Sequence, residues 1–404
     1  MIKNYLLTAF RNVLRYKGFS LINIFGLSLS MSVCMVIIIV IQDQYSYDDM
    51  HTLKDRIYRV QQVDSLDFTS LKIASNPYAL GTELRDNYAF AEEVVILNNS
   101  FSGEGLYRDT RLDMNGLYAN SAFFKVFGFP LADGSEPGIL DEPYTMVLSH
   151  ETARKFFGNE DPIGKFIQVD TLSYEITGIM AKTKQKSHIQ FEALISLPSL
   201  EIRDQLRDEP RFVNNWETGS GSWIYLLLDK NADLGKIQEI LDQISTDHYA
   251  DNEECKYSFY LQPLSKIVPG PLLGNEIGVA LPKVFIIFLG GLALVIIISA
   301  AFNYTSLSVA RSMLRAKEVG IRKTFGAFRS QVIYQFLIEA IVIAILSMVL
   351  AIALLQFLLP AFSGMQMMSL LEIRPEQNTQ IYLWFLLFAL VTGILSGVLP
   401  AVVI

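Results

Sequence analysis

The sequence predicts a membrane protein whose fold class is an α-helical transmembrane bundle of four spans with a large extracytoplasmic α+β domain inserted between spans 1 and 2. Three observations lead to this prediction. Apolar residues make up 51% of the 404 residues and charged residues only 18%, against about 25% in soluble domains. Four runs are apolar and long enough to cross a bilayer, which takes about 20 helical residues. The segments between these runs alternate in net charge.

The predicted spans are transmembrane 1 at 19–41, transmembrane 2 at 283–309, transmembrane 3 at 332–362 and transmembrane 4 at 381–404. Apart from Lys283 at an edge and Glu339, these ranges contain no charged residue. Four such runs in one chain argue against buried helices of a large soluble core. The fourth run reaches Ile404 without a basic flank, so we expect this chain to be the first part of a longer protein.

The charge distribution predicts the orientation in the membrane. Residues 1–18 carry a net charge of +4, and the loop at 310–331 carries +5. Segment 42–282 has 21 basic and 37 acidic residues, a net charge of −16, and the short loop at 363–380 carries −1. Because lysine and arginine are enriched on the cytoplasmic side, we expect the first two segments inside and the last two outside.

Residues 1–18 predict a cytoplasmic amphipathic helix. Its apolar residues recur at helical spacing: Ile2, Leu6, Phe10 and Val13. Basic side chains lie off this stripe, which is typical of a helix in the lipid interface. Packing of the same helix on the transmembrane bundle remains an alternative.

Segment 42–282 predicts interleaved strands and helices, as in α+β layers. Strand-like runs occur at 56–60, 93–97, 145–148, 165–169, 174–179 and 223–228. Asn76 before Pro77 predicts a helix N-cap, and Ser149 predicts the cap of a helix that ends at Gly158. Asn231 or Asp233 opens a further helix that runs to about residue 245.

The same segment offers little catalytic chemistry. Gly158–Lys165 resembles a phosphate-binding loop, but it has five residues between its glycines instead of four and no hydroxyl residue after its lysine. Among the four histidines no two share the spacing of one helix face, so no zinc site is indicated. We therefore expect a domain that binds or moves rather than an enzyme, with no catalytic residue, bound cofactor, metal or nucleic acid. A membrane-anchored enzyme remains a weaker alternative.

The cytoplasmic loop at 310–331 has the sharpest pattern in the chain. On a helix, its charged residues would form one stripe: Arg311, Arg315, Glu318, Arg322 and Arg329. Apolar residues would form a second stripe beside it: Leu314, Ile321, Phe325 and Phe328. Since a glycine costs about 1 kcal/mol inside a helix, Gly320 and Gly326 favour a short helix ending near Gly326. The alternatives are an anchor at lipid headgroups and a docking helix that enters a partner's groove, and the ordered apolar stripe favours docking.

This loop resembles the signature of ABC transporter permeases related to the macrolide exporter MacB and to FtsX. The matching pattern is Arg311-x-x-x-Arg315-x-Lys317-Glu318-Val319-Gly320-Ile321-Arg322-Lys323, with Gly326-Ala327 after it. Short motifs in the large segment resemble the MacB-like periplasmic core domain: Ser46-Tyr47-Asp48 with His51, residues 55–60, Phe127-Gly128-Phe129, Phe157-Gly158, Ile163-Gly164-Lys165 and Ser187-His188-Ile189. The resemblance covers essentially the whole chain, with an FtsX-like permease domain at 283–404.

The resemblance implies a non-catalytic permease in the bacterial inner membrane, with its large domain in the periplasm. In that family the loop between spans 2 and 3 contacts an ABC ATPase subunit, which binds ATP and Mg²⁺ and drives the permease by mechanotransmission. Carried over, the ATPase-coupling residues are Arg311, Arg315, Lys317, Glu318, Gly320, Ile321, Arg322, Lys323 and Gly326. The chain has no Walker motif, so the ATPase is expected in a separate polypeptide.

The resemblance further implies a dimer with a second permease copy or half, contact with membrane lipid, and a periplasmic adaptor or outer-membrane channel as further partners. The expected function is export or extraction of a peptide, drug or lipoprotein. The alternative is an FtsX-like regulator whose outer domain activates a cell-wall hydrolase or reports to a sensor kinase.

Overall fold

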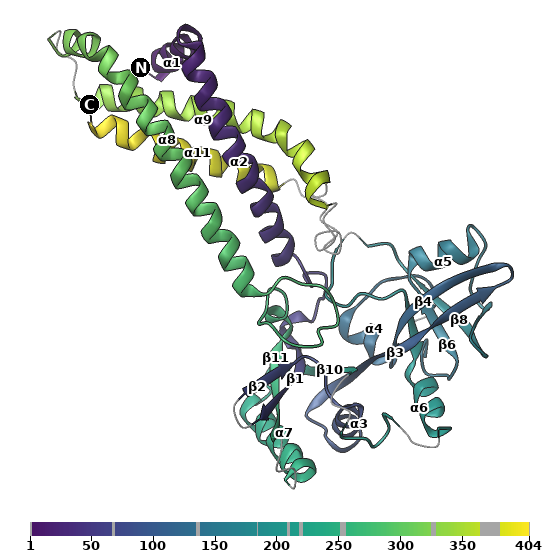
Figure 1. Cartoon of the computed structure of the whole chain (residues 1–404). Helices are drawn as coiled ribbons and strands as arrows, with labels where there is room; N and C mark the ends of the chain where they lie inside the picture. The colour runs from purple at the N-terminus through teal and green to yellow at the C-terminus, as the bar shows by residue number, and fades with distance from the viewer. Residues whose placement is uncertain are drawn as a thin grey trace. The chain divides into compact units, whose positions relative to one another are not determined.

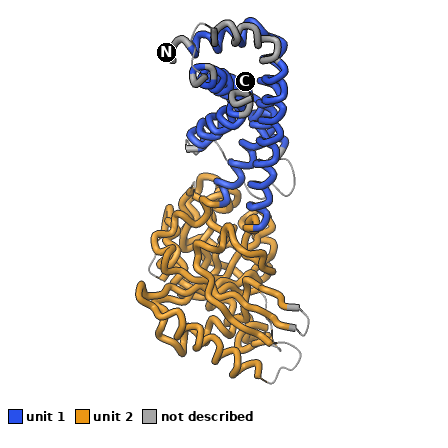
Figure 2. Tube along the Cα trace, turned by 90° about the vertical axis from the view of Figure 1, so that its left-hand side faces the viewer, with its two compact units in different colours: residues 1–44, 284–404 blue, residues 45–283 orange. Residues whose placement is uncertain are grey.

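The computed structural model describes residues 2–66, 69–134, 138–183, 185–207, 211–217, 221–250, 256–324, 329–363 and 380–403. The chain divides into two compact units (Figure 2). Residues 1–44 and 284–404 form one, here called the helical unit, and residues 45–283 form the other, here called the α+β domain.

The helical unit consists of long helices (Figure 1). They are α1 (Ile2–Arg15), α2 (Lys17–Tyr45), α8 (Lys283–Thr324), α9 (Arg329–Ser363) and α11 (Gln380–Val403). Four stretches are long and apolar enough to cross a membrane: Lys17–Tyr45, Lys283–Ala310, Ile333–Ala361 and Ile381–Val398. They confirm the four-span prediction, and the α+β domain lies between the first and second of them in the sequence.

Helix α1 packs against α9. The Asn12 Nδ2 group donates a hydrogen bond to Glu339 Oε2 at 3.3 Å, and both side chains are buried. Val13 packs against the cluster that contains Tyr304 and Ala340. The predicted apolar stripe is therefore divided, because Leu6 and Phe10 are exposed while Val13 contacts the bundle.

Helix α11 packs closely on α9 through two glycines one turn apart. A Cβ atom on Gly393 would lie 3.0 Å from the Cα of Ile341, and one on Gly397 would lie 2.8 Å from the Cβ of Ala340. Small residues at such an interface let two helix backbones approach each other, which favours association inside a bilayer.

The α+β domain contains one 11-stranded sheet. Its strands are β1 (Ile57–Leu66), β2 (Thr69–Ile73), β3 (Ala91–Tyr107), β4 (Thr110–Ala119), β5 (Leu131–Gly134), β6 (Thr145–Leu148), β7 (Phe166–Val169), β8 (Leu172–Met180), β9 (Ala193–Ser196), β10 (Ser222–Leu228) and β11 (Lys256–Pro263). The order is β11-β1-β10-β3-β4-β9-β6-β8-β5, with β2 beside β1. All six strand-like runs of the sequence are strands, which confirms the α+β prediction.

Part of the sheet closes on itself. Strand β7 pairs antiparallel with both β3 and β8, so β3, β4, β9, β6, β8 and β7 form a hydrogen-bonded ring. The pairs β4–β9 and β6–β8 are parallel, and the other pairs in the ring are antiparallel. Closure pairs the lateral edges that an open sheet would expose.

Both faces of the sheet are covered by a hydrophobic core. Neighbouring residues of a strand point to opposite sides, so Trp223 and Ile224 enter different cores. Ile224 belongs to a core shared with α3 (Tyr78–Asn87), α5 (His150–Phe157), α6 (Leu197–Gln205) and α7 (Leu234–Tyr249). Trp223 belongs to a second core, shared with α4 (Ala122–Phe127), with Leu264 of η2 (Leu264–Lys266) and with Ile267 after it. A 3₁₀ turn, η1 (Lys54–Arg56), precedes β1.

The helix caps agree with the sequence at two of three positions. Ser149 caps α5 by accepting a hydrogen bond from the Thr152 amide, and Asp233 caps α7, which continues to Tyr249. The prediction for Asn76 is wrong. Helix α3 begins at Tyr78 after Pro77, and the Asn76 side chain donates to the Val60 carbonyl at 2.8 Å, because it is buried against β1.

Candidate functional site

The predicted ATPase-coupling segment lies at the end of α8. Residues 311–324, which carry all but one of the predicted site residues, belong to this helix, and the structure describes their backbone. Gly326 lies outside the described residues. The charged and apolar stripes expected of residues 311–324 are therefore on a helix, and the contacts of their side chains remain predictions.

The prediction of a short helix is wrong in its length, whereas the described part of the helix ends at Thr324, close to the expected end near Gly326. Helix α8 is continuous for 42 residues and passes through Gly320 without a break. One glycine costs about 1 kcal/mol, whereas interrupting the helix would require a second costly nucleation step. The second span and the predicted coupling segment are thus parts of one helix.

A buried polar cluster occupies the part of the α+β domain nearest to the membrane spans in sequence. It centres on Asp48, three residues after the end of α2, whose backbone has a φ of 61° and whose side chain is buried. Its carboxylate accepts hydrogen bonds from the Ser187 hydroxyl at 2.7 Å, the His188 amide at 3.1 Å and His188 Nδ1 at 2.8 Å. His51 Nε2 lies 3.2 Å from the same carboxylate.

These partners set the charge of Asp48. Burial alone would raise the pKa of the carboxyl group. The electrostatic attraction and hydrogen bond of His188, together with the hydrogen bonds of His51 and Ser187, outweigh burial and lower the pKa well below its ordinary value. Asp48 is therefore a buried carboxylate.

The hydrogen-bond pattern also fixes the proton on one ring nitrogen of His51. Its Nδ1 atom lies 2.6 Å from the Phe127 carbonyl, which can only accept a hydrogen bond. Its Nε2 atom faces Asp48 and Ser187, and the Ser187 hydroxyl already donates to Asp48. The Nδ1 atom therefore carries a proton and donates it to Phe127, whereas Nε2 lies between the Asp48 carboxylate and the Ser187 hydroxyl.

A second branch of the cluster reaches the central strands. His188 Nε2 lies 2.7 Å from the hydroxyl of Tyr225, which is fully buried in β10. Tyr225 is the register partner of Arg59 in β1, so the two residues are neighbours on paired strands. Burial raises the pKa of Tyr225, so its hydroxyl stays protonated.

Arg59 connects this branch to the segment that leads into α8. Its guanidinium is fully buried and donates to Glu276 at 2.5 and 3.0 Å and to Gln262 at 2.8 Å. Burial opposes its charge, but the hydrogen bonds to Glu276 and the negative charge of that carboxylate outweigh burial and raise the pKa of Arg59. Such a bidentate pair is strong when both groups are held in place.

The cluster brings together two histidines that are far apart in the sequence. His51 and His188 both contact Asp48, although they lie on separate loops. The available signal was that Asp48 with His51, and Ser187 with His188, occur in motifs that resemble the core domain. Among the described ranges, no three His, Cys, Asp or Glu side chains are placed to hold a metal ion.

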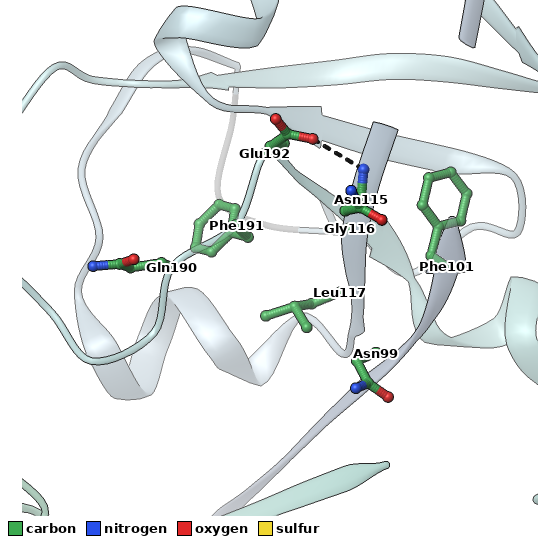
Figure 3. A pocket seen from close by; sticks show the side chains of 8 residues that line it. All are labelled: Asn99, Phe101, Asn115, Gly116, Leu117, Gln190, Phe191 and Glu192. Carbon is green, nitrogen blue, oxygen red and sulfur yellow. Dashed lines mark hydrogen bonds between the residues drawn. The ribbon is translucent and has the colours of Figure 1, made fainter. Parts of the chain in front are cut away.

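A pocket of about 470 Å³ opens beside β4 (Figure 3). Its lining residues come from β3, β4 and the loop before β9: Asn99, Phe101, Asn115, Gly116, Leu117, Gln190, Phe191 and Glu192. Glu192 Oε2 accepts a hydrogen bond from the Asn115 amide at 2.9 Å. This lining contains one ionisable side chain and no nucleophile beside a base, so it suits binding rather than catalysis.

The loop that resembles a phosphate site has a structural role. Gly158 ends α5 with a φ of 62°, and Phe166 begins β7. Glu160 accepts hydrogen bonds from Arg108 at 2.8 Å and from Lys165 at 2.9 Å, so the lysine is paired within the domain. The loop is a helix end, a turn and the start of a strand.

Comparison with known proteins covers both units. Residues 20–244 match the MacB-like periplasmic core domain, and residues 290–404 match the FtsX-like permease C-terminal domain. The chain belongs to the MacB/FtsX-like family of ABC transporter permeases. The buried cluster of this permease therefore lies largely within the core-domain match, with Gln262 and Glu276 beyond its end.

Its relatives are distant in sequence. The ABC transporter permease YknZ of Bacillus subtilis is 21% identical over 313 residues, which are 76% of this chain and 71% of YknZ. The macrolide export ATP-binding/permease protein MacB of Wolinella succinogenes is 23% identical over 291 residues, which are 70% of this chain and 40% of that protein. The permease thus spans less than half the length of this MacB relative. The crystal structure of the periplasmic region of MacB from Actinobacillus actinomycetemcomitans has a TM-score of 0.37 at 14% identity and covers 52% of this chain and 90% of its own.

Proposed function

We propose that this permease is the membrane subunit of an ABC complex of the mechanotransmission type. A partner ATPase would bind ATP and Mg²⁺, and its movement would pass through the helical unit to the α+β domain on the other side of the membrane. The permease itself contributes no catalytic residue to this scheme.

The continuity of α8 carries the proposal. Its 42 residues correspond to a helix of about 63 Å, whereas the hydrocarbon core of a bilayer is about 30 Å thick. The part from Arg311 to Thr324 extends beyond the candidate span, which ends at Ala310, and carries five basic residues and one acidic residue. A partner that binds this extension holds the same helix that begins at the α+β domain.

The family and this sequence support a set of proposed partners. These 404 residues contain no Walker motif, in keeping with ATP hydrolysis by a separate ABC ATPase subunit. A second permease copy or half completes a dimer in the bacterial inner membrane, with the acidic α+β domain in the periplasm. A relative named for macrolide export favours efflux as the direction, with a drug, peptide or lipoprotein as cargo and an adaptor or outer-membrane channel as a further partner.

The test reverses charges on the coupling segment. In the double variant Arg315→Glu and Arg322→Glu, like charges would oppose an acidic rim on the ATPase, and we expect a co-expressed ABC ATPase to lose its stimulation by the permease by on the order of tenfold. The readout is ATP hydrolysis by the reconstituted complex, with membrane insertion checked separately.

A matched control makes the same change of charge elsewhere. Lys155 and Lys236 are exposed on the α+β domain, so Lys155→Glu with Lys236→Glu should leave the stimulation unchanged. Equal stimulation in both double variants and in the unmodified permease would refute the proposed docking segment.

A further inference from the structure

The α+β domain is joined to the membrane spans by two short connections. Asp48 lies three residues after Tyr45, the last residue of α2, and Glu276 lies seven residues before Lys283, the first residue of α8. We call residues 46–51 the entry segment and residues 274–282 the exit segment. These two segments are the covalent connections between the helical unit and the α+β domain.

We propose that Asp48, His188, Tyr225, Arg59 and Glu276 form a single polar relay that fastens the entry segment to the exit segment through the central strands. Three steps are hydrogen bonds and one joins neighbouring residues of paired strands. Asp48 bonds His188, His188 bonds Tyr225, Tyr225 lies beside its register partner Arg59, and Arg59 bonds Glu276. In the proposed function, these five residues would be positioning residues, and this role depends on that function. The physical link between the two segments does not depend on it.

The relay joins two buried charges. Arg59 is the cation at one side, and the Asp48 carboxylate is the anion at the other. The Tyr225 hydroxyl and the His188 ring lie between them, with His188 bonded to Tyr225 at 2.7 Å and to Asp48 at 2.8 Å. Loss of one member of such a buried network leaves its neighbours without a partner and weakens the other bonds.

Sheet geometry places the middle of the relay. Tyr225 in β10, Arg59 in β1 and Gln262 in β11 are register partners, so their side chains lie in one row across three strands. Gln262 accepts from Arg59 and keeps the guanidinium in the plane that reaches Glu276. The relay therefore crosses the sheet where β1 is paired on both sides.

A backbone contact reinforces the link between the two segments. A Cβ atom on Gly278 of the exit segment would lie 2.2 Å from the carbonyl oxygen of His188, so only glycine fits at this distance. The exit segment is also bonded to the sheet, because the Trp223 Nε1 group donates to the Asn275 carbonyl at 2.8 Å. His188 thus contacts the entry segment with its ring and the exit segment with its backbone.

The alternative is that these residues only stabilise their own surroundings. A change at Asp48 would then loosen the entry segment and the loop at 186–189 and leave the exit segment unaffected. A relay instead requires that a change at one end is felt at the other, and that the effect is reciprocal. Amide hydrogen exchange of the full chain in detergent separates the two cases, because it measures opening segment by segment.

The first variant is Asp48→Asn, with exchange read at the Gly274 amide of the exit segment, bonded to Lys72, and at the Lys283 amide directly after it, bonded to Gly270. We expect both amides to exchange faster by on the order of tenfold. The matched control is Asp204→Asn, which removes an equally buried carboxylate of the same domain that has no bond to the relay. Both variants reduce overall stability, so a general loss of stability would raise exchange in the exit segment equally in the two. The relay predicts faster exchange there in Asp48→Asn than in Asp204→Asn.

The second pair of variants works from the other end. Gly278→Ala would push the exit segment away from His188, and we expect faster exchange of the Asp48 amide, which is bonded to Lys186. Gly274→Ala is the control, because its Cβ would lie 3.7 Å from the nearest atom, an ordinary contact distance.

Exit-segment exchange in Asp48→Asn equal to that in Asp204→Asn, or entry-segment exchange in Gly278→Ala equal to that in Gly274→Ala, would overturn the relay. These measurements need no ATPase, so they can fail while the charge reversal at Arg315 and Arg322 still abolishes stimulation. In that case the proposed function would stand and the relay would not.

Discussion

Asp204 is a buried carboxylate of the α+β domain that serves a different purpose from Asp48. Its two oxygens accept hydrogen bonds from three successive backbone amides, those of Arg211, Phe212 and Val213, at 2.8 to 2.9 Å. The carboxylate thus replaces a strand or helix as the partner of these amides, which fixes the chain after α6.

We predict that Asp204→Asn lowers the free energy of unfolding by about 2 kcal/mol, because an amide nitrogen would then face a backbone donor and leave it unsatisfied. Denaturant unfolding of the full chain in detergent, followed by tryptophan fluorescence, measures this loss. Asp109→Asn is the control, since Asp109 is exposed in the turn between β3 and β4. A loss of similar size in both variants would contradict the assigned role of Asp204.

The polar cluster marks the limit of what the sequence predicted at this scale. Asp48 and His188 meet although 140 positions separate them, and periodicity within one element carries no information about such a contact. Paired histidines are usually recognised by their spacing on one helix face. That signal is missing here because His51 and His188 both lie in loops. Only the motif resemblance singled out the two segments.

At the scale of elements, strands and apolar helices were predicted well because their patterns are local. The runs at 145–148 and 223–228 are strands buried along their whole length, and the four apolar runs are helices. Element ends were predicted less well, because tertiary contacts decide them. Asn76 is recruited by β1 instead of capping α3, and α8 continues through Gly320.

The packing of α11 on α9 predicts an effect of side-chain volume. We expect Gly397→Val to lower the free energy of unfolding by about 1–3 kcal/mol, since its Cβ would meet Ala340 at 2.8 Å and force the helices apart. Thermal unfolding in detergent provides the measurement. Gly290→Val in α8 is the matched control, because no atom lies within 4 Å of its Cβ position. An unchanged melting temperature for Gly397→Val would show that this interface does not stabilise the helical unit.

At the scale of the whole molecule, the charge distribution predicts a topology. The α+β domain belongs to the segment with a net charge of −16, and the loop at 310–331 carries +5, so the two should lie on opposite sides of the membrane. In a background of Cys34→Ser and Cys255→Ser, we expect Lys236→Cys to react with an impermeant maleimide in intact spheroplasts. Arg315→Cys should react only after the membrane is permeabilised.

The opposite labelling pattern would place the coupling segment outside the cell and would overturn the proposed function as well. Cys34 is buried in α2, so its removal serves only to leave a single reactive thiol. Surface exposure of Lys236 makes it a suitable reporter for the α+β domain.

The unbroken length of α8 has a geometric consequence. A straight rod of about 63 Å that tilts by about 5° around one end displaces its other end by about 5 Å. A rigid helix would therefore amplify a small angular change at its basic end into a translation comparable with one helical turn at Lys283. A hinge within the helix, for example in the variant Gly320→Pro, would leave both ends intact. A tilt of the basic end would then bend the helix at the hinge and displace Lys283 less.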